Sequence, residues 1–546
     1  MAKTIRTIKG ISASPGMAYG EVFLLDNDTS FVIEKKTVAN TKAEISRFHD
    51  SLEIVKEQIR HLRTKMSLQL SKSDLEIYDA HISILEDPEL IDKTKNLIST
   101  QSCCADFALH SVAKEYVQLL EQLDDEYLSA RAQDIDEVAK DVIKSLQGRL
   151  TQGLQLNKPA ILVADQISIH QISTIDREFV IGIITSNGGT TDHTSILYNA
   201  MGIPAIVGVG TNLNFIKKSV VVLLDAEIGS VTIDPDSKTL EAFQEQCLNY
   251  RQTEKDNLKN CHLPAETLSG KKIKVYANIG NFNEAKEAQR RGADGVGLLR
   301  TEFCFMDRKT LPSEDEQFNM YKAMLDELSG KEVVIRLIDI GSDKKVPYIG
   351  MDEEENPALG TRALRLGFKH YEKLLKPQIR ALLRLSSAYN IHLLFPMIAT
   401  PEDLHEIKAA VRMEMRGLQK EGFKTNSSIP MGIMVEIPNV ALMPEKFVED
   451  VDFFSFGTND LAQYLMAADR TNPSVSDYIP AAVPGILNII RGVVKVAHAQ
   501  GKWVGICGGL AADTALTEAF INMGVDELSM PASAIPKIKA FVRKLD

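Results

Sequence analysis

The chain is poor in residues that mark several protein classes. Its 546 residues include one tryptophan, and its six cysteines form no CxxC pair and no cluster with ligand spacing. Neither a zinc site nor a disulfide scaffold is therefore indicated. The basic N-terminus is not followed by an uninterrupted apolar stretch, which argues against a secretory signal, and we expect no apolar run long enough to span a bilayer. These absences predict a protein of the reducing cytoplasm.

An excess of positive charge is also missing. Asp and Glu number 74 against 62 Lys and Arg, a formal net charge of −12 at pH 7, so nonspecific binding to nucleic acid is not favoured. Hydrophobic and charged fractions of 44% and 25% are ordinary for a globular protein, and the length predicts several domains.

Proline is nearly absent between Thr41 and Leu150, where Pro88 is the only one. Apolar residues recur in this segment at three- and four-residue steps, which is typical of amphipathic helices, and a helical bundle is expected. One short strand-like run, EVFLLD, precedes the segment, and β-rich runs such as AILVAD and FVIGIIT follow from Ala160. We therefore expect the bundle to be an insertion in a small α/β domain.

Eight strand-like apolar runs can be counted in the C-terminal half, most of them separated by helix-compatible segments. Eight such units predict a (β/α)8 barrel, which typically takes ~250 residues. An open doubly wound sheet is the less favoured alternative because the count is eight. The runs are IKVYANIG, GVGLLRTEF, EVVIRLIDIG, IHLLFPMI, PMGIMVEIP, VDFFSFGTND, KWVGICGG and VDELSM.

Polar residues stand at or near the ends of these runs, where a barrel forms its active face. Any one of them could simply end its strand, but their number favours a site. Several guanidinium groups suit a small, highly anionic ligand, because arginine pairs bidentately with phosphate and carboxylate. The carboxylates Glu436 and Asp460 suit Mg²⁺, and phosphoenolpyruvate would satisfy both halves of such a site. The residues are Arg300, Arg336, Glu436, Asn459, Asp460, Arg470 and Cys507.

The stretch GGTTDHTSILYNAMGIPAIVG places His193 after two glycines and before an apolar, helix-like run. A helix N-terminus offers unpaired N–H groups and the positive end of a dipole, which stabilise an anionic phosphoryl group on a nearby imidazole. On this stretch alone, a helix-capping histidine explains the pattern at least as well as a phosphoryl acceptor.

Five motifs, GVGLLRTEFCFMDR, RLIDIGSDK, NPALGTRALR, FFSFGTNDLAQY and GGTTDHTSI with GIPAIVG, closely resemble enzyme I of the bacterial phosphotransferase system. The similarity extends over nearly the whole chain. It implies that phosphoenolpyruvate phosphorylates His193, that pyruvate is released, and that the phosphoryl group passes to the histidine-containing phosphocarrier protein HPr in the first step of sugar uptake or its regulation. It also implies a homodimer formed through the barrel, with neither nucleic acid nor a membrane as partner.

The resemblance also implies roles for single residues. Glu436 and Asp460 are expected to hold Mg²⁺, and Cys507 to protonate the enolate carbon. The acidic helices around residues 71–90 are expected to bind the basic carrier. The expected substrate-binding residues are Arg300, Arg336, Asn459, Asp460, Arg470, Arg362 and Lys344.

The implied fold class is a multidomain α/β protein, with a phosphohistidine swivelling α/β domain that carries an inserted helical bundle and is followed by a (β/α)8 TIM barrel. We expect the first domain in residues 1–27 and 147–234 and the carrier-binding bundle in 28–146. A connector helix is expected in 235–262, and the phosphoenolpyruvate-binding barrel in 263–546.

Several positions depart from the family pattern, and three of them change the charge. Asp192 replaces a serine and places a like charge beside a phosphohistidine, Asn199 stands where the family has an arginine, and Gly509 replaces a glutamate. We expect a functional but slower or specialised enzyme. The alternative is a degenerate relative that acts as a regulatory binding protein with weak or no phosphotransfer. A phosphoenolpyruvate synthase or a pyruvate phosphate dikinase would need an ATP-binding domain for which the chain has no room.

Overall fold

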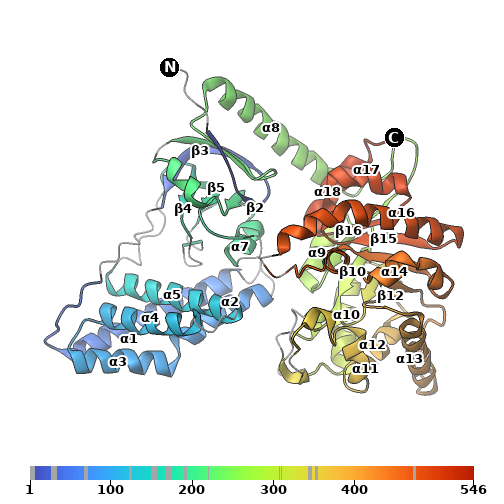
Figure 1. Ribbon diagram of the computed structural model, residues 1–546, viewed down its shortest axis with the longest axis horizontal. Helices are drawn as coiled ribbons and strands as arrows, with labels where there is room; N and C mark the ends of the chain where they lie inside the picture. The colour runs from blue at the N-terminus through green and yellow to red at the C-terminus, as the bar shows by residue number, and fades with distance from the viewer. Residues whose placement is uncertain are drawn as a thin grey trace. The chain divides into compact units, whose positions relative to one another are not determined.

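Two units make up the chain, Met1–Arg251 and Gln252–Asp546, and each is described by itself (Figure 1). The computed structural model describes residues 6–25, 33–66, 72–121, 126–148, 156–167, 171–172, 175–176, 178–189, 193–218, 220–306, 308, 310–341, 347–350, 354–470, 472 and 475–546.

The first unit contains an eight-stranded mixed sheet with the strand order β1-β8-β7-β3-β4-β5-β6-β2. β3, β4, β5 and β6 run parallel, and the outer pairs are antiparallel. The central strands β4 and β5 are almost continuously apolar and buried, as expected for parallel strands covered on both faces. The strands are β1 (Arg6–Lys9), β2 (Ile11–Ser14), β3 (Met17–Leu24), β4 (Ala160–Ala164), β5 (Val180–Thr185), β6 (Ala205–Val207), β7 (Val221–Asp225) and β8 (Ser230–Ile233).

The predicted helical bundle is inserted between β3 and β4, so the insertion is confirmed. The apolar stripe of its first helix, including Phe48, Leu52 and Val55, is buried in the bundle core. Asp87 caps the third helix by accepting a 2.8 Å hydrogen bond from the amide of Glu89. The helices are α1 (Thr41–Met66), α2 (Lys72–Leu85), α3 (Pro88–Gln101), α4 (Ala105–Glu121) and α5 (Glu126–Leu146).

Three further elements complete the segment between the bundle and the second unit. α7 (His193–Met201) lies between β5 and β6, and the short 3-10 helix η1 (Gly210–Phe215) follows β6. α8 (Ser237–Lys259) then crosses from residue 251 of the first unit to residue 252 of the second. Its sequence is polar, as predicted for a connector helix.

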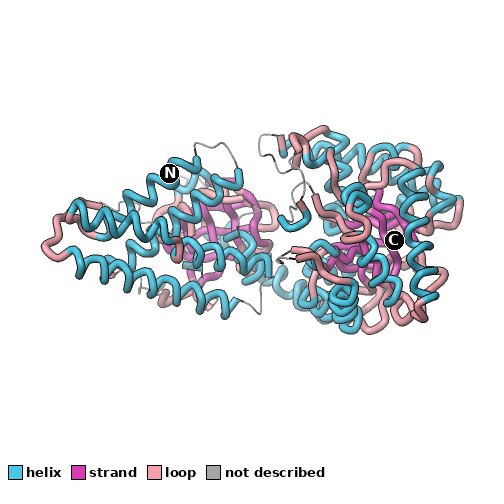
Figure 2. Tube along the Cα trace, turned by 90° about the horizontal axis from the view of Figure 1, so that it is seen from below, coloured by secondary structure: helices cyan, strands magenta, loops and turns pink. Residues whose placement is uncertain are grey.

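The second unit is built on a closed barrel of eight parallel strands in the order β9 to β16, so the (β/α)8 prediction is confirmed. Figure 2 shows its strands enclosed by helices. Every predicted strand run contains one observed strand. The strands are β9 (Lys274–Ile279), β10 (Val296–Arg300), β11 (Val333–Arg336), β12 (Ile391–Phe395), β13 (Met431–Val435), β14 (Phe453–Gly457), β15 (Trp503–Cys507) and β16 (Glu527–Met530).

The helices of the second unit follow these strands in sequence. The α-helices are α9 (Phe282–Arg290), α10 (Glu314–Glu327), α11 (Leu364–Lys369), α12 (Leu375–Leu385), α13 (Pro401–Lys420), α14 (Pro438–Leu442), α15 (Thr458–Met466), α16 (Val483–Ala499), α17 (Thr514–Met523) and α18 (Ile535–Val542). The 3-10 helices are η2 (Thr301–Cys304), η3 (Pro347–Ile349), η4 (Pro357–Leu359), η5 (Pro444–Lys446), η6 (Val448–Asp450), η7 (Ser476–Ala482), η8 (Gly509–Ala512) and η9 (Ala532–Ala534).

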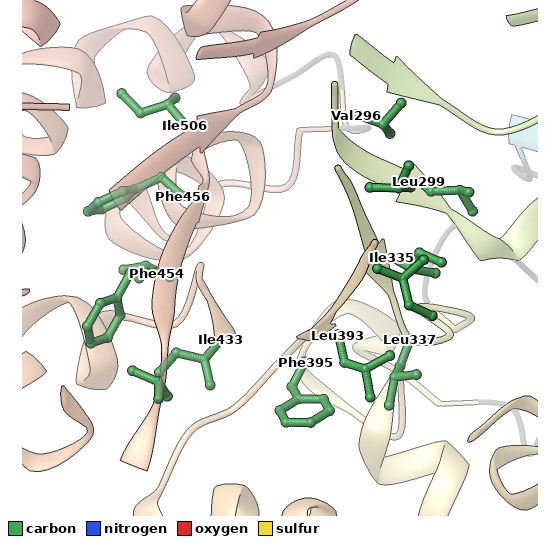
Figure 3. Packing of buried hydrophobic residues seen from close by; sticks show 14 of the residues in the cluster. Val296, Leu299, Ile335, Leu337, Leu393, Phe395, Ile433, Phe454, Phe456 and Ile506 are labelled. Atoms are coloured by element: carbon green, nitrogen blue, oxygen red, sulfur yellow. The ribbon is translucent and has the colours of Figure 1, made fainter. Parts of the chain in front are cut away.

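The main apolar core of the second unit joins the barrel strands to the surrounding helices. Leu299, Ile335, Leu393 and Phe454 belong to this core (Figure 3). A smaller apolar cluster includes the alternate strand residues Val334, Leu394, Phe453 and Cys507. Because successive side chains of a strand point to opposite faces, this second cluster lies inside the barrel, and the polar residues at the strand ends extend from it.

One segment, Tyr478–Ala499, is long and apolar enough to cross a membrane by length and composition, which differs from the sequence expectation. It comprises η7 and α16, and α16 contacts β14 and β15. A helix that covers a barrel passes such a test on composition alone, so the segment is weak support for a membrane span.

Candidate active site at the barrel mouth

A chain of buried ion pairs runs across the C-terminal ends of the barrel strands. Arg336, the last residue of β11, donates to Glu302, and its Nη1 lies 3.0 Å from Asp339 Oδ2. Arg362 donates through Nη2 to Asp339 Oδ1 at 2.9 Å and through Nη1 to Asp460 Oδ1 at 3.0 Å. All five side chains are buried. The predicted residues Arg336, Arg362 and Asp460 therefore lie in one network.

Arg300 and Arg470 extend this network at two sides. Arg300 ends β10 and is the register partner of Arg336, and its Nη2 lies 3.3 Å from Glu284 Oε2. Arg470 follows α15, and its Nη1 lies 4.0 Å from Asp460 Oδ2. Four of the predicted arginines are thus connected to one mouth by ion pairs or by strand register.

Several polar atoms of this mouth are buried and have no hydrogen-bond partner among the residues that the structure describes. Three are guanidinium N–H donors, the Nε atoms of Arg300, Arg336 and Arg362. The hydroxyl of Thr458 and Oε2 of Glu436 are two more such atoms. Such atoms normally have partners, because each one left unpaired costs about 1–3 kcal/mol. Donors without acceptors beside a carboxylate oxygen without a donor are the arrangement expected for an anion and a cation bound together.

Glu436 follows β13 and is fully buried. Its Oε1 accepts a 2.6 Å hydrogen bond from the amide of Met397. Burial raises its pKa to about 8, and the carboxylates Asp460 and Asp339 add to that increase. A bound cation would reverse this shift by favouring the ionised carboxylate.

The oxygen donors at the mouth fit Mg²⁺ if the substrate supplies some of the ligands of the ion. Among the described residues, no group of three or more His, Cys, Asp or Glu side chains could hold a metal. Mg²⁺ is commonly bound by one or two carboxylates, with waters and substrate oxygens completing its octahedron, and Glu436 with its unpaired Oε2 meets that requirement together with Asp460.

Glycines keep the mouth open around these groups. A Cβ at Gly457 would lie 2.9 Å from Glu436 Oε2, and a Cβ at Gly508 would lie 2.6 Å from Thr458 Oγ1. Gly508 also has a φ of +137°, which side-chain-bearing residues rarely adopt. Both positions therefore require glycine if the polar atoms are to face the opening.

Cys507 ends β15 beside Gly457 of β14 and is 3% exposed. Burial raises the pKa of its thiol to about 12, so the sulfur carries its proton at neutral pH. Its Sγ lies 3.2 Å from the carbonyl oxygen of Phe456 and accepts a 3.4 Å hydrogen bond from Ser455. The group is suited to give up a proton only when a strong base forms next to it.

His193 lies in the first unit, in α7, and residues 190–192 before it lie outside the described part of the chain. The backbone before it turns at Gly188, where φ is +116°, and Ser195 Oγ donates to the carbonyl oxygen of Gly189 at 2.6 Å. Asn199 is exposed. Asp192 lies outside the described residues, and so does Lys344.

The sequence interpretation missed two members of the ion-pair network, Glu302 and Asp339. Each follows a predicted arginine within three residues, in LLRTE and RLID. A buried arginine at a strand end requires a carboxylate partner, and that requirement could have identified both. Asn459, by contrast, is exposed on the first turn of α15.

Three family models identify the class of protein to which this barrel belongs. Residues 254–546 match the family described as "PEP-utilising enzyme, PEP-binding domain". Residues 9–131 match "PEP-utilising enzyme, N-terminal", and residues 156–229 match "PEP-utilising enzyme, mobile domain". The chain is thus a phosphoenolpyruvate-utilising enzyme.

Curated relatives narrow this to one family. The chain is 38% identical to the phosphoenolpyruvate-protein phosphotransferase of Priestia megaterium over 541 residues, 99% of this chain and 94% of the relative. It is 38% identical to that of Bacillus subtilis (strain 168), over 99% and 95%, and 36% identical to that of Haemophilus influenzae, over 99% and 94%. The chain belongs to the phosphoenolpyruvate-protein phosphotransferase family, and its activity is phosphoenolpyruvate-dependent phosphotransfer.

Proposed function

We propose that the enzyme transfers the phosphoryl group of phosphoenolpyruvate to His193, releases pyruvate, and then phosphorylates a small histidine-containing carrier protein of the HPr type. The observation that carries the first half is the group of unpaired guanidinium donors beside the unpaired oxygen of Glu436 at the barrel mouth. Phosphoenolpyruvate supplies six acceptor oxygens to such donors and can share a cation with the carboxylate.

The residues at the barrel mouth would have different roles in substrate binding. Arg300, Arg336 and Arg470 hold the phosphate and carboxylate oxygens, with Asn459 at the exposed rim. Arg362 fixes Asp460 and Asp339 in place through its two hydrogen bonds. Lys344 keeps its predicted place among the substrate contacts. Because dry surroundings strengthen each charge-assisted hydrogen bond, the buried network binds the substrate in one orientation.

The proposed reaction involves His193, phosphoenolpyruvate and the thiol of Cys507. The neutral imidazole of His193 forms an N–P bond, the bridging P–O bond breaks, and its electron pair stays on the enolate oxygen. The enolate becomes a ketone as its terminal carbon takes the proton of the Cys507 thiol. Because His193 and the barrel belong to different units, the first unit must bring the imidazole to the barrel mouth.

Glu436 and Asp460 would hold Mg²⁺ at this mouth. When bound, the ion neutralises charge on the substrate oxygens and acts as a Lewis acid. Glu436 then remains ionised, although burial favours its neutral form.

The carrier partner is expected on the acidic helices of the bundle. Glu86, Asp87 and Glu89 are exposed at the junction of α2 and α3, whereas the nearby Ile84 and Leu85 are buried in the bundle core. Polar rather than apolar contacts would therefore dominate the interface. A basic carrier suits the net charge of −12, because opposite charges increase the association rate.

A homodimer through the barrel and a cytoplasmic location complete the proposal. Leu442 of α14 and Tyr478 of η7 are 66% and 59% exposed, and both elements contact α16. Large exposed apolar side chains of this kind are typical of subunit interfaces. All six cysteines are free thiols, as expected in a reducing compartment.

Labelled phosphoenolpyruvate tests the phosphoacceptor directly. With Mg²⁺ present, wild type is expected to acquire an acid-labile label, and His193→Ala to acquire none. Label on His193→Ala would show that another residue is the phosphoryl acceptor. No label on either protein would favour the regulatory binding protein.

The departures near the acceptor predict a rate effect. Asp192→Ser removes a like charge beside the phosphohistidine, so phosphorylation of His193 is expected to become faster. A quenched-flow time course of the label measures this rate. An unchanged rate would show that the charge of Asp192 does not slow the phosphorylation of His193.

A further inference from the structure

A carboxyl group is buried inside the barrel, one residue layer below Cys507. Glu527 begins β16 and is 1% exposed. In the strand register Glu527 lies opposite Gly505, and Ser529 lies opposite Cys507. Since residues two apart on a strand share a face, the carboxyl is on the inner side of the barrel, toward the N-terminal ends of its strands.

Two glycines make room for this carboxyl. A Cβ at Gly297 would lie 2.1 Å from Glu527 Oε1 and 2.6 Å from Ser529 Oγ. A Cβ at Gly505 would lie 3.3 Å from the same Oε1. The inner positions of β10 and β15 therefore carry no side chain where the acid group is placed, directly below the layer of the thiol.

One oxygen of this acid group, Oε2, is buried and has no hydrogen-bond partner among the described residues. Burial raises the pKa of Glu527 to about 8, Glu332 and Asp526 add to the increase, and Lys274 opposes it. Glu527 is thus a neutral carboxylic acid near pH 7, with a proton that it can release and regain.

Solvent reaches the N-terminal end of the barrel beside this acid. The side chain of Lys274, the first residue of β9, is 46% exposed, and its Nζ lies 3.0 Å from Glu332 Oε1. The hydroxyl of Tyr276 donates to the same oxygen at 3.1 Å. Lys274 is the register partner of Glu527, so protons from solvent can arrive at this end of the barrel.

One hydroxyl in the layer of the carboxyl reaches the thiol in the layer above. Ser455 of β14 is the register partner of Gly505, beside which the carboxyl lies. Its Oγ donates to Cys507 Sγ at 3.4 Å and is buried. Ser455 is therefore placed to stabilise the thiolate and to conduct a proton toward it.

We propose that Glu527 supplies, through the Ser455 hydroxyl, the proton that restores the Cys507 thiol after each pyruvate is formed; this inference rests on the proposed function. The S–H bond breaks as the enolate carbon gains its C–H bond, and the thiolate then takes the Ser455 hydroxyl proton. Ser455 regains a proton from the Glu527 carboxylic acid. The carboxylate is reprotonated by water at the N-terminal end of the barrel.

Two isotopic labels in one reaction measure reversible phosphotransfer and the reprotonation of the Cys507 thiol separately. The enzyme, phosphoenolpyruvate, Mg²⁺ and carbon-labelled pyruvate are incubated in D₂O, and the phosphoenolpyruvate pool is analysed for the carbon label and for vinyl deuterium. Carbon exchange requires only reversible phosphotransfer, because the thiolate can take back a proton from the next pyruvate. Deuterium enters only if the thiol exchanges with solvent between turnovers.

We expect Glu527→Gln to keep carbon exchange within about twofold of wild type while the deuterium-to-carbon ratio falls at least about tenfold, a typical lower range for losing an acid–base group. Ser455→Ala is expected to lower the same ratio. If Glu527→Gln does not fold, Ser455→Ala tests the proton path by itself. Glu414→Gln, which removes another buried acid of this unit, is the control and should keep the wild-type ratio.

An unchanged ratio in a folded Glu527→Gln or Ser455→Ala would show that the thiol is restored from the mouth and would overturn the inference. Failure of carbon exchange in wild type would instead reject the proposed function.

Discussion

At the scale of single residues, the site depends on carboxylates that hold arginines. Asp339 accepts from two guanidinium groups, at 3.0 Å from Arg336 and 2.9 Å from Arg362. Without Asp339 both cations would remain buried with one partner fewer. Removing one partner of a buried ion pair is far more costly than removing a surface pair.

Asp339→Asn is therefore expected to destabilise the barrel by about 3–5 kcal/mol and to weaken substrate binding as the arginines shift. Denaturant unfolding measures the first effect, and the KM for phosphoenolpyruvate the second. Asp315→Asn breaks an exposed pair with Arg384 and should cost about 1 kcal/mol or less. Equal losses of unfolding free energy in the two variants would show that the buried network stabilises the barrel no more than a surface ion pair does.

The raised pKa of Glu527, about 8, predicts how stability depends on pH. The unfolded carboxyl ionises near pH 4.3, whereas the folded group stays neutral up to about pH 8. Its contribution to stability is complete below pH 4.3 and is lost as the pH rises toward 8. Glu527→Gln removes this loss, so its stability relative to wild type should rise with pH by up to about 1.4 kcal/mol per unit.

Urea unfolding of both proteins at several values between pH 5 and pH 8 measures this difference. Glu445→Gln, which removes an exposed carboxylate of the same unit, is the control. A Glu527→Gln curve parallel to that of wild type would mean that the carboxyl is ionised in the folded protein.

At the scale of elements, strand and helix glycines have opposite roles. Gly297 of β10 faces the Glu527 carboxyl, with 2.1 Å between its would-be Cβ and Oε1. Gly417 in the last turn of α13 has only ordinary contacts, the nearest at 3.7 Å from Arg380 Nη1.

Gly297→Ala is accordingly expected to destabilise the barrel by about 1–3 kcal/mol, the usual cost of overpacking a core. Gly417→Ala should stabilise it by about 0.5–1 kcal/mol, because alanine favours the helix interior. Thermal unfolding compares the two variants with wild type. A stabilised Gly297→Ala would place the carboxyl outside the barrel interior.

At the scale of the whole molecule, the exposed apolar side chains near α16 bear on assembly. Tyr478 and Leu442 are expected to be covered by a second copy of the barrel unit. Leu442→Glu with Tyr478→Glu should convert dimer to monomer in sedimentation velocity, because burying two carboxylates opposes association. Leu268→Glu, at another site that is 70% exposed, should leave the dimer intact. A wild type that is monomeric at micromolar concentration would reject the interface.

The order of the parts could be predicted from the sequence alone: an inserted helical bundle, a mixed α/β sheet and eight barrel strands. Periodicity and proline distribution are local properties, so they can be read without knowing the fold. The residues at strand ends were also predictable, because a parallel barrel gathers those ends at one face.

Which charges meet depends on the fold. Glu302 pairs with Arg336 and Asp339 with Arg362 because segments distant in sequence come together at the barrel mouth, and Ile84 and Leu85 are removed from the bundle surface because the bundle core buries them. Glu527 gained its environment from Gly297 and Gly505, on two different strands. Ion pairing and burial depend on three-dimensional distance, which composition and spacing along a chain do not contain.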